Sequence, residues 1–84
     1  MQLSHFTTSS LVSSTEAELI GYSMKATEDS EVVIRNGDDS SATGIVFVLL
    51  GDGKSITNEA SIKFTNGLYV DVVSGDVEGA VWVR

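Results

Sequence analysis

The side chains that could carry out acid–base or nucleophilic chemistry are few and scattered. His5 is the only histidine, and the chain contains no cysteine. No carboxylate flanks His5, so the sequence gives no sign of a nucleophile–base pair built on it. Twelve acidic residues are present, but no feature of the sequence selects two of them as a glycosidase pair. We therefore interpret His5 as an exposed or interface residue and predict that the protein is not an enzyme.

Three aspartates in glycine-containing segments, Asp38, Asp39 and Asp52, are the candidates for a metal site. Carboxylate oxygens are ligands for Ca²⁺, but the spacing here matches no EF-hand loop. Aspartate is also a common turn residue, because its side chain accepts hydrogen bonds from nearby backbone groups. The run Gly51-Asp-Gly-Lys-Ser55 resembles the end of a phosphate-binding loop, yet it lacks the upstream glycine and a following helix pattern. We interpret the aspartates as turn residues, with a calcium site as the alternative, and predict no cofactor.

Length and charge limit the possible partners. A chain of 84 residues forms one domain, which buries only about 60–65% of its unfolded surface and gains stability from association. The net charge of −7 predicts repulsion from phosphate backbones, and hence no nucleic-acid partner. The N-terminus lacks a signal-peptide pattern. The longest unbroken apolar stretch, residues 45–50, is too short to span a membrane.

The elements that must position any site are strands. Apolar and polar residues alternate on both sides of Asn66-Gly67, which predicts a hairpin with a two-residue type I′ turn. Ser74-Gly75-Asp76 predicts the next turn, and residues 77–84 the last strand. The alternating apolar positions are Ala60, Ile62, Phe64, Leu68, Val70 and Val72.

The N-terminal half is less regular. Residues 1–14 are rich in Ser and Thr, and predict either an arm or a first strand. Residues 17–26 fit a helix behind the capping box Thr15-x-x-Glu18, or an alternating strand. Gly21 would cost that helix about 1 kcal/mol, so we favour the strand.

The middle of the chain, residues 31–58, is predicted to contain two strands and two loops. Residues 31–35 are predicted as a strand, and residues 36–44 and 51–58 as polar loops. Residues 45–50 are apolar at every position, which predicts a central strand covered on both faces.

Together these signals predict an all-β protein. Turn residues recur about every ten positions, and no proline interrupts a strand. We predict a single antiparallel β-sandwich of jelly-roll-like topology with six to eight short strands. It would span residues 15–84, preceded by the arm or first strand at residues 1–14.

A few apolar residues are candidates for contacts with other subunits. If Val81 and Val83 face the core, Trp82 points outward, and Tyr69 does the same on its own strand. The opposite phase places Trp82 in the core, and the sequence allows both. The N-terminal segment contributes three more candidates, Phe6, Leu11 and Val12.

Several segments resemble those of small all-β structural proteins of tailed bacteriophages. They are Glu18-Leu-Ile-Gly-Tyr-Ser-Met24, Val32-Val-Ile-Arg-Asn-Gly-Asp38, Phe64-Thr-Asn-Gly-Leu-Tyr-Val-Asp-Val72, the Ser74-Gly75 turn and Val81-Trp-Val83. The resemblance covers residues 17–84 and rests on structural motifs.

The resemblance implies a virion component without catalytic residues. A capsid decoration or cement protein is the first interpretation, and a tail or head–tail adaptor component the second. The first implies a homotrimer that binds the major capsid protein on the phage head surface, after assembly in the bacterial cytoplasm. A glycan-binding module on the virion surface, with Trp82 and Tyr69 as its aromatic residues, is the rival hypothesis.

Overall fold

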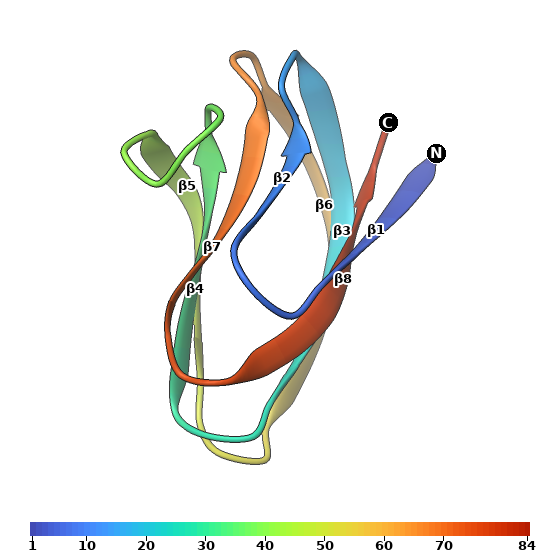
Figure 1. The fold of residues 1–84 in the computed structure, drawn as a ribbon. Helices are drawn as coiled ribbons and strands as arrows, with labels where there is room; N and C mark the ends of the chain where they lie inside the picture. Colours follow the sequence, from blue (N-terminus) through green and yellow to red (C-terminus); the bar gives the residue numbers. More distant parts are fainter.

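The computed structural model describes all 84 residues and consists of strands and turns (Figure 1). It contains no helix that could cross a membrane. The strands are β1 (Gln2–Phe6), β2 (Ser10–Ser13), β3 (Ala17–Ala26), β4 (Ser30–Asn36), β5 (Thr43–Leu50), β6 (Ser55–Phe64), β7 (Leu68–Ser74) and β8 (Val77–Val83).

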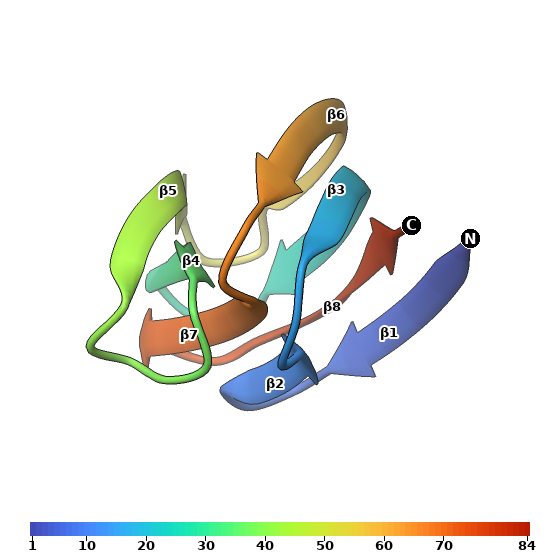
Figure 2. The same ribbon diagram turned by 90° about the horizontal axis from the view of Figure 1, so that it is seen from above.

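The strands form two four-stranded antiparallel sheets, with the orders β1-β8-β3-β6 and β2-β7-β4-β5. The first half of the chain pairs with the second half in reverse order: β1 with β8, β2 with β7, β3 with β6 and β4 with β5. This is a long hairpin, folded between β4 and β5 and then rolled up, which is the jelly-roll arrangement. Figure 2, viewed from above, shows the two sheets on either side of the core. The predicted antiparallel sandwich is confirmed.

Alternating side chains from both sheets fill the core. In β3, Met24 and Ala26 are buried on the face that the predicted alternation gave them, whereas Leu19, which that alternation placed on the opposite face, is buried as well. A bulge between Leu19 and Gly21 shifts the alternation by one position, so that Tyr22 also faces inward. The largest fully buried side chains are Phe64, Leu19, Met24, Ile34, Leu68, Val32, Val70 and Val81.

The predicted hairpin at Asn66-Gly67 is wrong. These residues connect β6 in one sheet to β7 in the other, so the flanking strands do not pair. Asn66 does not adopt the positive φ of a type I′ turn, whereas Gly67 has φ of 126°. The Gly67 carbonyl accepts a hydrogen bond from Gly37 N at 3.1 Å, which holds the connection against the end of β4. Gly75, with φ of 89°, serves the next crossing, from β7 to β8.

The predicted central position of residues 45–50 is also wrong. They lie in β5, which is the edge strand of its sheet. Val48 and Leu50 are buried, but Phe47 and Leu49 on the opposite face are 67% and 79% exposed. The sandwich covers only one face of each sheet, so an apolar run here leaves its outward residues in solvent. The loop predicted for residues 51–58 is shorter than expected, because β6 begins at Ser55.

Residues 1–14 contain β1 and β2, which pair with β8 and β7. Phe6 is 4% exposed and belongs to the core, so it is not free to contact a neighbouring subunit. Val12 is half-buried against the same core, while Leu11 is exposed on the outer face of its sheet.

Candidate interaction surfaces

The two most exposed large apolar side chains within the strands, Phe47 and Leu49, lie on the outer face of the β2-β7-β4-β5 sheet. Ile45, Phe47 and Leu49 of β5 point away from the core, and we call them the β5 face. No residue of β5 is charged, although the whole chain has a net charge of −7. Edge strands are usually protected from association by charged side chains, bulges or proline. The β5 face lacks the charged residues, so it is available for contact with another protein surface.

Phe47 is held against its own sheet. It lies opposite Val33 of β4 in the strand register, and Val33 is only 2% exposed although it faces outward. A Cβ atom placed on Gly44 would lie 2.8 Å from both Phe47 Cζ and Val33 Cγ1. The phenyl ring therefore covers Gly44 and Val33, and presents its other face to solvent as a preformed contact surface.

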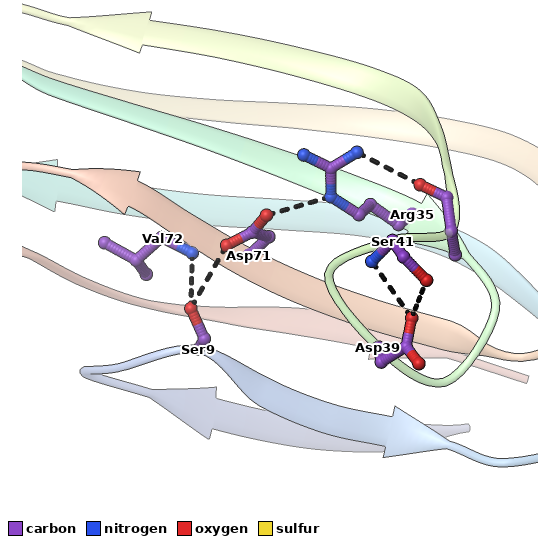
Figure 3. A network of polar contacts seen from close by, with 7 residues as sticks. Ser9, Arg35, Asp39, Ser41, Asp71 and Val72 are labelled. Carbon is purple, nitrogen blue, oxygen red and sulfur yellow. Dashed lines mark hydrogen bonds and ion pairs between the residues drawn. The ribbon is translucent and has the colours of Figure 1, made fainter.

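A polar network borders the β5 face (Figure 3). Arg35 Nε donates a hydrogen bond to Asp71 Oδ2 at 2.9 Å, and Arg35 Nη1 donates to the Ala42 carbonyl at 3.0 Å. Ser9 Oγ donates to Asp71 Oδ1 at 3.3 Å and accepts a hydrogen bond from Val72 N at 2.9 Å. The network joins β4, β7, the β4–β5 loop and the β1–β2 connection, so it fixes the elements beside the β5 face.

The three aspartates of the alternative calcium site do not come together. Asp38 and Asp39 lie in the loop before β5, and Asp52 lies in the turn after it, at the other end of the strand (Figure 1). The Asp39 carboxylate accepts hydrogen bonds from Ser41 Oγ at 2.6 Å and Ser41 N at 2.9 Å, which lower the pKa of Asp39. No group of three His, Cys, Asp or Glu residues is placed to hold a metal ion. Asp39 acts here as a turn residue, through the hydrogen bonds that its carboxylate accepts from Ser41.

Trp82 lies on the outer face of the other sheet. Its neighbours Val81 and Val83 are buried in the core, which decides between the two phases that the sequence allowed. A Cβ atom on Gly21 would lie 3.4 Å from Trp82 Cε3, so the indole lies over the bare backbone of Gly21 on β3. The tighter contact for such a Cβ atom would be the carbonyl oxygen of Asn58 on β6, at 3.1 Å.

A groove crosses the same outer face beside Trp82, and we call it the Trp82 groove. Its volume is about 460 Å³, and residues from all four strands β1, β8, β3 and β6 line it. A smaller hollow of about 290 Å³ lies on the other side of Trp82. The side chains that line the groove around Trp82 include His5, Ser23, Lys25, Thr57, Glu78 and Ala80.

The register brings these groove residues into two rows. His5, Ala80, Ser23 and Thr57 lie side by side across the sheet, and Ser23 Oγ and Thr57 Oγ1 are hydrogen-bonded at 2.9 Å. Lys25 lies opposite Glu78 in the next row. Sequence reasoning singled out His5 and Trp82 but missed the others, because they become neighbours only through pairing between strands distant in sequence.

Tyr69 and Trp82 do not form a shared surface. Tyr69 is half-buried on β7 in the other sheet, beside Arg35 of β4 and Leu11 of β2. The two aromatic side chains therefore lie on opposite outer faces of the sandwich, although β7 and β8 follow each other in sequence.

Comparison of the chain with protein-family models, with curated proteins and with solved structures finds no match. The resemblance to phage structural proteins therefore stays a prediction from sequence motifs. The observations available for a functional proposal are the jelly-roll fold, the β5 face and the Trp82 groove.

Proposed function

We propose that this chain is a non-catalytic structural protein of a bacteriophage virion, and that it works as a decoration or cement protein on the phage head. The observation that carries the proposal is the β5 face, an uncharged apolar surface on an edge strand of an acidic protein. The jelly-roll fold supports it, since viral capsid domains use this architecture. The sequence resemblance of residues 17–84 to phage structural proteins gives the virion assignment.

Association at the β5 face would add stability that the small core does not supply alone. Complete burial of a Phe or Leu side chain contributes about 1.5–3 kcal/mol. Phe47 and Leu49 have most of that contribution still available, because both are largely exposed in the single chain. A homo-oligomer or a docked complex stabilises the folded chain by mass action.

Charge also favours this face as the contact between copies. Two chains that each carry −7 repel one another, and the repulsion is smallest where few acidic side chains enter the interface. β5 itself contributes none, and Glu31 of β4, opposite Leu49 in the strand register, is its one acidic register neighbour. We therefore place the contact between neighbouring subunits on the β5 face. A trimer closes by three-fold rotation when the β5 face of each copy packs on a different surface of the next. The trimeric order itself rests on the sequence resemblance.

Binding to phage heads tests the location. Purified protein is mixed with undecorated heads, with mature heads and with isolated tails of the phage that encodes it, and bound copies are counted by quantitative mass spectrometry. We expect saturable binding to undecorated heads, at a copy number that matches the local three-fold positions. Binding to tails or to the head–tail junction alone would replace the decoration role with the adaptor role. Binding to no virion part would overturn the virion proposal.

Oligomeric state tests the β5 face separately. Leu49→Glu places a charge on this face, and Leu3→Glu places the same charge on an exposed leucine of β1 in the other sheet. Sedimentation equilibrium should show a trimer for the parent and for Leu3→Glu, and a monomer for Leu49→Glu. Equal association of the two variants would show that subunits meet elsewhere.

A further inference from the structure

We propose that the Trp82 groove binds a neutral oligosaccharide, with one sugar ring stacked on the Trp82 indole. This site goes beyond the structural role proposed above. It lies on the outer face of the β1-β8-β3-β6 sheet, whereas the β5 face belongs to the opposite sheet. The β5 face and the groove therefore lie on different sheets and do not overlap.

The shape of the groove suits an extended chain ligand. Its centre is formed by short side chains, Ala80 and Ser23, and it reaches across all four strands. His5 on β1 and Thr57 on β6 stand at its two sides. The hollow beyond Trp82 continues it past the indole toward Asn58 and Glu59. A ligand of several linked units can occupy both hollows at once, with Trp82 between them.

The Trp82 indole provides an apolar platform. The Cε3 atom of the ring lies beside the backbone at Gly21, and the ring borders both hollows, so part of the indole is open to a ligand. The face of an aromatic ring carries partial negative charge, which attracts the C–H groups on one side of a pyranose ring.

The polar groups of the groove match hydroxyl groups. Ser23 and Thr57 each donate and accept hydrogen bonds, as sugar hydroxyls do, and the His5 imidazole adds a ring N–H donor. Lys25 donates only, and the Glu78 carboxylate accepts only. These two residues are register neighbours but form no ion pair, so both retain capacity for a ligand.

Charge selects a neutral ligand over a charged one. Lys25 and Glu78 offset each other within the groove, and Glu59 adds a negative charge in the neighbouring hollow. A phosphate or a uronic acid would meet both carboxylates, and a cationic peptide would meet Lys25. A neutral, hydroxyl-rich chain has no such conflict.

Trp82 is the only tryptophan, so its fluorescence reports the site directly. The full-length protein is titrated to millimolar concentration with neutral hexasaccharides of glucose, N-acetylglucosamine, mannose and galactose. Polygalacturonate and a lysine-rich peptide serve as charged probes. We expect a saturable change in Trp82 emission with at least one neutral hexasaccharide and none with the charged probes. No response to any neutral hexasaccharide, or a response to a charged probe alone, would overturn the proposal.

Variants then locate the binding by calorimetry, which does not depend on the indole. Trp82→Ala should weaken binding about tenfold or more, because it removes the platform. Ser23→Ala combined with Thr57→Val should also weaken it, whereas Tyr69→Ala on the opposite face should leave it unchanged. Circular dichroism and thermal melting confirm that each variant is folded. Unchanged affinity in Trp82→Ala, or loss of affinity only in Tyr69→Ala, would place binding outside the groove and refute the inference.

Discussion

Arg35 on β4 donates a hydrogen bond from Nε to the carboxylate of Asp71 on β7, at 2.9 Å. The two side chains are only 21% and 13% exposed, so each charge is partly removed from solvent and is compensated by the other. Arg35 also holds the Ala42 carbonyl in the loop that leads into β5. The pair therefore connects the middle of the sheet to the start of the strand that carries the β5 face.

This arrangement predicts measurable coupling between the two residues. In a double-mutant cycle with Arg35→Met and Asp71→Asn, we expect a coupling free energy of about 1 kcal/mol, above that of most exposed pairs. Urea denaturation of the four proteins provides the measurement. The exposed pair Arg84–Glu18, at 3.5 Å, is the control, and its coupling should be close to zero. Equal coupling in both cycles would mean that burial does not strengthen the Arg35–Asp71 contact.

Two phenylalanines should differ sharply in their contribution to stability. Phe64 is fully buried, and Phe64→Ala should lower the free energy of unfolding by about 3–5 kcal/mol. Phe47 is 67% exposed, and Phe47→Ala should cost about 0.5–1 kcal/mol, mainly through the uncovering of Val33. Chemical denaturation of the monomeric protein measures both. Similar losses for the two variants would contradict the edge position of β5.

Two glycines with positive φ form a second matched pair. A Cβ atom on Gly67 would lie 2.8 Å from the carbonyl oxygens of Gly37 and Ser13, while a Cβ atom on Gly53 would meet nothing within 4 Å. Gly53→Ala should cost only the conformational strain, about 1–2 kcal/mol. Gly67→Ala should cost clearly more, because backbone must also move. Thermal melting tests the order, and an equal loss would show that the tight packing around Gly67 is not maintained.

Asp39 should titrate below the ordinary range of an aspartate. Both hydrogen bonds from Ser41 favour the charged carboxylate, so the pKa of Asp39 is lowered in the folded protein. The stabilisation is present above the unfolded pKa and is lost as the pH falls through the lower, folded pKa. Titration followed by carboxyl ¹³C NMR should show the lowered value, and Ser41→Ala should return it toward normal. A pKa that Ser41→Ala leaves unchanged would assign the shift to another cause.

Deletion of residues 1–14 should disrupt the sandwich itself. It removes β1 and β2, leaves β8 and β7 without these partners, and takes Phe6 from the core. We expect the truncated protein to lose cooperative unfolding or to melt at a much lower temperature than the parent. Circular dichroism during heating measures this. An unchanged melting profile would show that residues 1–14 are an independent arm.

The sequence alone was sufficient to predict the strands in which one face is apolar and the other polar. In β7, and in β3 from Tyr22 to Ala26, apolar and polar residues alternate, and this period-two pattern indicates that one face is covered. Gly21 favoured a strand over a helix at residues 17–26 through its low helix propensity. These signals are local, because they depend only on neighbouring residues, and they led to the antiparallel sandwich and to its short strands. These local signals could not predict whether Trp82 faces the core or the solvent, or which residues line the groove.

Only the tertiary structure decided which strands pair and which faces stay open. A uniformly apolar strand such as β5 has no alternation to show its exposed side, so its pattern fits an edge strand as well as a central one. Asn66-Gly67 reverses the chain direction, but the turn does not determine whether the next strand joins the same sheet. That choice depends on pairing over long sequence separations, such as β3 with β8 and β2 with β7. The same pairing brings His5, Ser23 and Thr57 into one row, because hydrogen bonds between distant strands, and not neighbouring residues, set the register.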